Sequence, residues 1–211
     1  MTRWSDRPGR WEHVSVINTS PVYIDPDPSI TYTYIMATKI KTEETATRKL
    51  ILIRHSKAED YSSEISDFER SLTVRGKINS RHMAEILRAR GEDPGRIISS
   101  PAFRALETAL IFCREYDISP AEIRLAPELY HGLGEEDFLD FLRQQSDEDH
   151  TVTLFGHNPL ITELAAYFAA DEPELLPKTG IYCMEFHASG WQEVEPDSGR
   201  TLYFLTPGKL A

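Results

Sequence analysis

The apolar run Leu50-Ile51-Leu52-Ile53 is the feature that most constrains the fold of this chain. Four apolar residues in a row are typical of a strand that is buried on both faces of a sheet. The run ends at Arg54-His55, a cation and an imidazole whose burial is costly unless they have a role. In open α/β sheets, ligands bind just beyond the carboxyl ends of the strands. The sequence therefore predicts a functional site directly after this strand.

Two further stretches have the same layout of an apolar strand, a polar end and a helix start. Ile97-Ile98 leads into Ser99-Ser100-Pro101, and Arg104 follows one helical turn later. Thr151–Phe155 leads into Gly156-His157. If the three strands lie in one sheet, their basic residues can converge on one anionic ligand, most naturally a phosphate.

An ordered set of motifs connects these stretches. The motifs are, in chain order, Arg54-His55-Ser56-Lys57-Ala58, Asp67-x-x-Arg70-x-Leu72-Thr73-x-x-Gly76, Ser100-Pro101-x-x-Arg104-Ala105-x-x-Thr108, Leu129-Tyr130 and Gly156-His157-Asn158-Pro159-Leu160. Any one motif is weak, but the ordered set is specific. It resembles the histidine phosphatase superfamily, and within it the short bacterial phosphohistidine phosphatases of the SixA type. The resemblance runs from about Lys49 to the C-terminus. Ser56 stands where many members have glycine, and we expect the small serine to be tolerated.

The alternation of strands and helices predicts an α/β fold, a three-layer α/β/α sandwich around a mostly parallel, doubly wound sheet. The resemblance implies the phosphoglycerate-mutase-like version of it. Thr73 is expected to cap the first helix and Gly91 to end it, with Ile78, Met83, Ile86 and Leu87 on its inner side. Asn158 is expected to cap the last helix, with Pro159 at its first position. Strands are predicted at 49–53, 96–99, 123–125, 151–155, 180–187 and 201–205, the last two antiparallel, and helices at 74–90, 101–115, 137–145 and after 158.

Residues 1–48 lack a core-forming pattern and are interpreted as a poorly ordered extension, with the domain at 49–211. Met36 is an alternative natural start. Asp25 and Asp27 imitate the aspartate pair of haloacid-dehalogenase phosphatases, but prolines flank the second aspartate and no matching downstream set is present. We therefore interpret that piece as a turn-rich loop.

The chain carries a net charge of −11, and residues 1–48 hold six acidic and six basic side chains, so the acidity lies in residues 49–211. An acidic body argues against nucleic acid or an anionic membrane as partner. Cys113 and Cys183 do not make a disulfide framework and are expected to be buried small hydrophobes. Neither a membrane-spanning run nor a signal-peptide core is visible, so a cytoplasmic location is the default.

The chemistry of the expected site rests on four residues. His55 is the expected nucleophile, because a neutral imidazole nitrogen can attack phosphorus and form a phosphohistidine. Arg54 and Arg104 are expected to clamp the phosphoryl group, since a guanidinium matches phosphate oxygens. His157, just before a helix N-terminus, is expected to be a second phosphate ligand that is protonated when substrate binds.

Other residues have weaker assignments. Arg70 and Ser100 are candidates to line the pocket, although Ser100 could instead cap the helix after Pro101. Lys57 could add positive potential or only solvate its loop.

The general acid is less well defined. The superfamily usually has a carboxylic acid after a later strand, and by position Glu128 is the candidate, with Glu135 or Glu136 as alternatives. Each of them could equally be an ordinary exposed carboxylate. Short phosphohistidine phosphatases need an acid less, because an imidazole is a better leaving group than an alkoxide.

We therefore expect a metal-independent, cofactor-free phosphatase that removes phosphate from phosphohistidine on a protein of the histidine-containing phosphotransfer type. Alternatives are a phosphatase of small phosphate esters, a mutase of the same superfamily, or a catalytically silent phosphate-binding or adaptor module. Signatures of other catalytic classes are missing: neither cysteine has Arg six residues later, and there is no G-x-S-x-G, H-E-x-x-H or P-loop.

Overall fold

The fold is built around strand β1 (Thr47–Arg54), which sends alternate side chains to opposite faces of a sheet. The computed structural model describes residues 46–170, 173 and 175–208, so residues 1–45 of the expected extension, with Asp25 and Asp27, lie outside the described residues. Thr47 and Arg48, which were expected to belong to the extension, are part of β1. Leu50 and Leu52 enter one hydrophobic core, and Ile51 and Ile53 enter the other. All four side chains are fully buried, as the apolar run predicted.

Within the described residues, six strands form one sheet in the order β3-β2-β4-β1-β5-β6. The first four strands of that order are parallel, and β5 and β6 are antiparallel at one end. The mostly parallel sheet and its antiparallel end are confirmed. The strands after β1 are β2 (Arg96–Ser99), β3 (Arg124–Leu125), β4 (Thr151–Gly156), β5 (Ile181–His187) and β6 (Arg200–Leu205).

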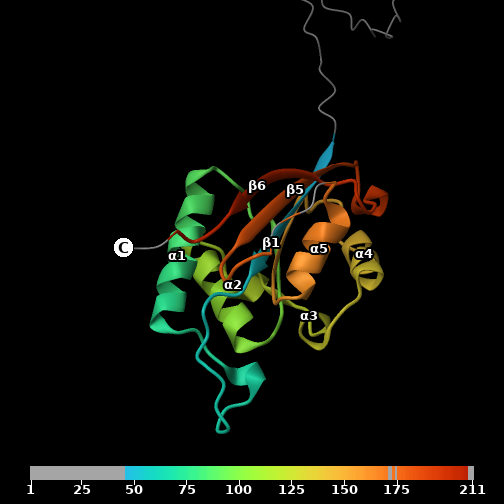
Figure 1. Cartoon of the computed structure of the whole chain (residues 1–211). Helices are drawn as coiled ribbons and strands as arrows, with labels where there is room; N and C mark the ends of the chain where they lie inside the picture. The colour runs from blue at the N-terminus through green and yellow to red at the C-terminus, as the bar shows by residue number, and fades with distance from the viewer. Residues whose placement is uncertain (1–45, 171–172, 174, 209–211) are drawn as a thin grey trace, which may run out of the picture. The chain divides into compact units, whose positions relative to one another are not determined.

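Helices cover both faces of the sheet, which completes the expected three layers (Figure 1). On one face lie α1 (Val74–Ala89) and α2 (Phe103–Glu115), and on the other lie α3 (Glu128–His131), α4 (Glu135–Arg143) and α5 (Leu160–Phe168). Short 3-10 turns occur at Asp67–Glu69, Pro120–Glu122 and Trp191–Glu193. In the part of the chain that is described, no helix has the length and apolar character needed to cross a membrane.

The buried face of α1 differs from the one expected. Met83 and Leu87 are buried as predicted, but Ile78 is 54% exposed. The first two turns of α1 instead turn the small residues Gly76 and Ser80 inward. A Cβ atom on Gly76 would lie 2.1 Å from the carbonyl oxygen of Lys57, so the helix approaches the loop after β1 too closely for a larger side chain. Ile78 lies two residues after Gly76, about 200° around the helix, and therefore faces outward.

The start of α5 is a second difference. Pro159 occupies the N-cap position, and no side chain caps the helix. The Asn158 side chain is used elsewhere, because its amide donates to the carbonyl of Leu176 and its oxygen accepts from the hydroxyl of Thr162. By contrast, Thr73 caps α1 by accepting from the amide of Gly76, as expected. Gly91, with φ at +74°, follows the end of that helix.

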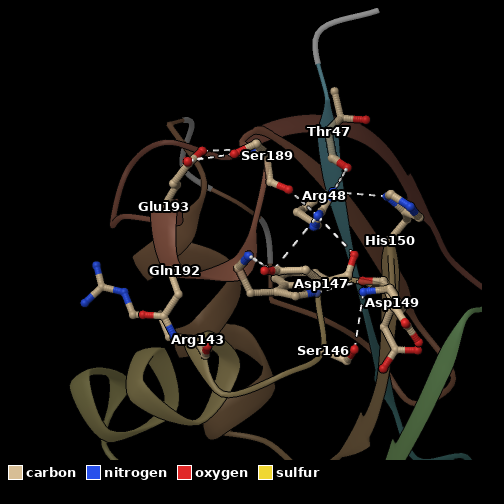
Figure 2. A network of polar contacts seen from close by, with 12 residues as sticks. Thr47, Arg48, Arg143, Ser146, Asp147, Asp149, His150, Ser189, Gln192 and Glu193 are labelled. Atoms are coloured by element: carbon tan, nitrogen blue, oxygen red, sulfur yellow. Dashed lines mark hydrogen bonds and ion pairs between the residues drawn. The ribbon is translucent and has the colours of Figure 1, made fainter.

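The amino-terminal end of β1 is held by a buried cation, Arg48, which is 2% exposed (Figure 2). Its guanidinium donates to the carbonyl oxygens of Thr47, Asp147 and Ser189 and contacts Nδ1 of His150 at 3.0 Å. Arg48 thus ties β1 to the loop before β4 and to the loop after β5. This network lies at the opposite end of β1 from Arg54.

Candidate active site

The candidate site lies at the carboxyl ends of β2, β4 and β1, which are neighbours in the sheet. The amide of His55 donates to the carbonyl of Gly156, and the amide of Ser100 donates to the carbonyl of Phe155. These bonds continue the parallel pairing one residue beyond the strands, so the three strand ends meet at one edge. The strand ends therefore bring His55, Ser100 and His157 to the same edge of the sheet.

His55 is buried, and its ring has one tautomer. Nδ1 lies 2.7 Å from the carbonyl oxygen of Ser56. Because a carbonyl only accepts, Nδ1 carries the proton and Nε2 keeps a free lone pair. Burial, and then the nearby His157, lower the pKa of His55 to about 3. The ring is therefore neutral at neutral pH, which is the form that can act as a nucleophile.

His157 faces His55, and the centroids of the two rings are 5.0 Å apart. Its Nε2 lies 2.8 Å from Oγ of Ser100, and its Nδ1 is buried without a partner among the described residues. Burial and the charge of Arg104 lower the pKa of His157 to about 4. The free protein thus holds a neutral His157, and the expected protonation requires the negative charge of a bound phosphate to raise its pKa.

Arg54 ends β1 and is partly buried. Its Nη1 donates to the carbonyl of Leu176 at 2.8 Å, while its Nε is buried without a partner among the described residues. Burial lowers the pKa of this guanidinium. Its positive charge also contributes to the lowered pKa of both histidines, after burial and the other nearby charges. Arg54 thus belongs to the same electrostatic cluster as His55 and His157.

Arg104 stands in the first turn of α2 and is held by one residue, Asp67. Its Nη2 donates to Oδ2 of Asp67 at 2.9 Å, and its Nη1 donates to the backbone oxygen of the same residue at 2.6 Å. Only 7% of Arg104 is exposed. Its charge lowers the pKa of both His55 and His157, so it also lies in the cluster. Two guanidinium groups therefore lie close enough to the two imidazoles to lower their pKa values, and the Asp67 carboxylate holds one of these guanidinium groups.

Arg70 and Lys57 lie farther from the histidines. Arg70 donates to Oδ1 of Asp67 at 2.7 Å and to the carbonyl of Glu59 at 2.8 Å. It therefore supports Asp67 rather than either histidine. Lys57 is exposed, and its backbone carbonyl oxygen accepts hydrogen bonds from the amide and the hydroxyl of Thr73.

Glu128 is not brought into the cluster by any contact. It begins α3, is exposed, and forms no side-chain hydrogen bond or ion pair among the described residues. Glu135 is half-buried and Glu136 exposed at the start of α4, also without a contact to the site. The carboxylate that does touch the cluster is Asp67. Hydrogen bonds from Arg70 and the charge of Arg104 lower its pKa although burial opposes them, so it is ionised at neutral pH and is a poor general acid.

We compared the sequence and the structure with those of known proteins. No protein-family model matches the chain. An uncharacterised protein of Picosynechococcus is 28% identical over 169 residues, which cover 76% of this chain and 97% of the relative. A protein of Agrobacterium tumefaciens classed as a SixA phosphohistidine phosphatase is 27% identical with a TM-score of 0.61, covering 75% of this chain and 98% of that one. The protein histidine phosphatase SixA complexed with tungstate is 22% identical with a TM-score of 0.64, over 75% and 97%. The chain therefore resembles proteins of the histidine phosphatase superfamily, in particular its SixA branch.

The expected phosphoglycerate-mutase-like fold is thereby confirmed. The similarity to a SixA protein also supports phosphatase activity, without identifying the substrate.

The turn after β1 is fixed by a residue that the sequence did not single out, Thr179. Its φ is +64°, a strained conformation for a β-branched residue, and it is fully buried. Its amide donates to the carbonyl oxygens of Arg54 and His55, and its hydroxyl donates to Oγ of Ser56. The Ser56 hydroxyl in turn donates to the carbonyl of Gly76. Ser56 is therefore accommodated, as expected, and it links the turn after β1 to α1.

Thr108 is a second supporting residue. Its hydroxyl oxygen accepts from the amide of Ser56 at 3.1 Å and its hydroxyl donates to the carbonyl of Arg104. It thus connects the backbone beside His55 with the backbone of Arg104. Thr108 and Asp67 both belong to motifs quoted above, so the sequence carried a signal for each, but their spacing gave no indication of what they contact.

A metal centre has no ready donor set in the described part of the chain, where no group of three or more His, Cys, Asp or Glu side chains is placed to hold an ion. Cys113 and Cys183 are fully buried, and burial raises the pKa of each thiol, to about 11 and about 12. Both are therefore small core residues rather than nucleophiles, as expected.

Proposed function

We propose that this protein is a phosphatase that works through a phosphohistidine on His55 and acts on phosphohistidine carried by a protein. The observation that carries the proposal is the hydrogen bond from Nδ1 of His55 to the carbonyl of Ser56. It leaves Nε2 as an unprotonated nucleophile inside a cluster of cations. Two unpaired buried atoms, Nε of Arg54 and Nδ1 of His157, add support, because a bound phosphate could satisfy them.

In the first step, Nε2 of His55 attacks the phosphorus and a new P–N bond forms. The P–N bond of the substrate breaks, and its electron pair goes to the departing imidazole, which takes a proton from solvent. Arg54 and Arg104 balance the charge on the phosphoryl oxygens during the transfer. Arg104 is held in place for this by Asp67.

In the second step, water attacks the phosphorus of the phosphoenzyme. The bond to Nε2 breaks, its electron pair returns to His55, and the proton of the water passes to solvent, which releases inorganic phosphate. An imidazole leaving group needs less protonation than an alkoxide, so the exposed position of Glu128 is compatible with this chemistry. The proposal needs neither a metal nor a cofactor, because two arginines and a histidine supply the positive charge.

The protein substrate is supported by the short connection between β3 and β4. It contains α3 and α4, and α4 packs Phe138 and Leu142 into the core against the sheet. The connection therefore forms part of a layer rather than a lid that would enclose a small ligand. An open site gains little from binding a small sugar but can admit a side chain on a bulky protein.

The test compares kcat/KM for a phosphorylated histidine-containing phosphotransfer domain with kcat/KM for a panel of small phosphate esters, all in the presence of a chelator. The proposal predicts that the phosphoprotein is preferred and that the chelator has no effect. An ester turned over as efficiently as the phosphoprotein would contradict the substrate assignment. Loss of activity on chelation, with rescue by Mg²⁺, would contradict the mechanism.

A further inference from the structure

A row of aromatic rings extends from His157, the neighbour of His55, to the surface. The ring of Tyr130 stands edge-on to His157 with centroids 6.0 Å apart, and Phe68 stands edge-on to Tyr130 at 5.1 Å. Phe103 contacts Phe68 at 5.9 Å. These rings come from α3, from the turn at 67–69 and from the start of α2, so three separate segments are brought together at this place.

The outermost ring, that of Phe103, is exposed. His157, Phe68 and Tyr130 are half-buried, and Phe103 is 41% exposed. Exposed aromatic side chains are costly to keep in contact with water, and a cluster of them beside a polar site marks a surface that another group can cover. The cluster lies directly beside the cations, because the hydroxyl of Tyr130 is 3.4 Å from Oδ2 of Asp67, which holds Arg104.

We propose that Tyr130 and Phe68 form the leaving-group subsite, a wall that receives the planar imidazole ring of a phosphohistidine. The inference rests on the proposed function and deepens it. A phosphoryl group held by Arg54, Arg104 and His157 has one substituent left over, and that substituent has to point out of the cluster of cations. The row of rings starts at His157, so it is the surface that the outgoing ring meets.

The wall favours substrates with an aromatic leaving group, through the shape and the electrostatics of the rings. Edge-to-face and offset contacts between aromatic rings stabilise a pair beyond the area that is buried, whereas a flexible alkyl chain gains no such contact. A ring on the substrate should therefore raise kcat/KM, and removal of the wall should abolish only that advantage. The Tyr130 hydroxyl is a separate feature, since it contacts Asp67 rather than the outgoing ring.

The test uses two substrates that share a P–N bond and differ in the ring: free phosphohistidine and phosphoramidate. The measured quantity is the ratio of their kcat/KM values. Tyr130→Leu and Phe68→Leu are each expected to lower this ratio roughly 3- to 10-fold, the range that one aromatic contact supports. Tyr130→Phe keeps the ring and should keep the ratio. Tyr61→Leu removes a 75% exposed aromatic outside the row and is the matched control.

An unchanged ratio in both leucine variants would overturn the inference, and so would an equal fall in Tyr130→Phe and Tyr130→Leu. If one leucine variant does not fold, the other decides the question. A failure of the proposed function looks different, because the wild-type protein would then form no phosphoenzyme on His55 with either substrate. If the phosphoenzyme forms on His55 but the ratio of kcat/KM values is unchanged in the leucine variants, only the proposed wall is refuted.

Discussion

Nδ1 of His55 lies 2.7 Å from the carbonyl oxygen of Ser56, and this contact fixes where the proton of the ring is carried. The same contact stabilises the protonated ring, but burial and the charges of His157, Arg104 and Arg54 act more strongly and lower the pKa of His55 to about 3. We predict that the ring does not titrate between pH 5 and pH 8. Following its Cε1 proton by NMR, with His55→Asn to assign the signal, measures this directly. A midpoint near pH 6.5 would show that the ring is solvated and that the nucleophile is half protonated in use.

The lowered pKa values predict a loss of stability in mild acid. A histidine that is neutral when folded and has a pKa near 6.5 when unfolded binds more protons in the unfolded state below that pH. Stability is therefore fully present above pH 6.5 and falls as the pH approaches the folded pKa, about 4 for His157. The free energy of unfolding is measured with urea at pH 7.0 and at pH 5.5. Between these two pH values, His157→Asn should lose about 1 kcal/mol less of this free energy than the wild-type protein loses. Equal losses would contradict the low pKa.

Asp67 is predicted to position Arg104. Asp67→Asn keeps the shape but removes the charge that holds Nη2 of Arg104 at 2.9 Å. Hydrogen bonds to charged groups contribute about 1.5 kcal/mol or more, so kcat/KM should fall roughly 10-fold. Glu69→Gln, in the same turn and exposed, is the control and should keep wild-type activity. An increase in activity would instead show that the carboxylate competes with phosphate for Arg104.

Arg48 is predicted to contribute to stability and not to turnover. Arg48→Met leaves the carbonyls of Asp147 and Ser189 without their donor, and a buried acceptor left unsatisfied costs about 1–3 kcal/mol, so we expect a loss of about 3 kcal/mol for the two together. The melting temperature should fall by roughly 6–12 °C for a domain of this size, with kcat retained by the folded protein. Arg88→Met, which breaks an exposed pair with Asp117, should have little effect on melting. Similar shifts in the two variants would contradict the role of the network.

The sheet and the central cluster were predictable because local patterns determine them. Leu50 to Ile53 can be buried on both faces only at the centre of an α/β sheet, and such a sheet collects the residues after its parallel strands at one edge. His55 and His157 were therefore found from strand ends alone. Arg104 lies one helical turn beyond the end of β2, so its prediction also depended on recognising the helix that follows β2.

The misplaced residues depend on contacts between segments that are distant in the sequence. Ile78 looked like a core residue, but the close approach of Gly76 to Lys57 turns it outward. Asn158 looked like a cap, but the carbonyl of Leu176 takes its amide. Likewise, no local pattern distinguishes Asp67, which holds Arg104, from Glu128, which is exposed.

The central claim is that the phosphoryl group is carried on His55, and a trapped intermediate tests it most directly. The wild-type protein is mixed briefly with phosphoramidate, quenched in alkali and digested, and the phosphorylated peptide is sequenced by mass spectrometry. His55→Asn is the matched control, because the asparagine amide can still donate to the carbonyl of Ser56 in place of Nδ1. We predict an acid-labile, alkali-stable phosphate on His55 in the wild-type protein and none in His55→Asn, which should also lose turnover. Phosphate on His157, or on a serine, cysteine or aspartate, or turnover that survives in His55→Asn, would contradict the mechanism.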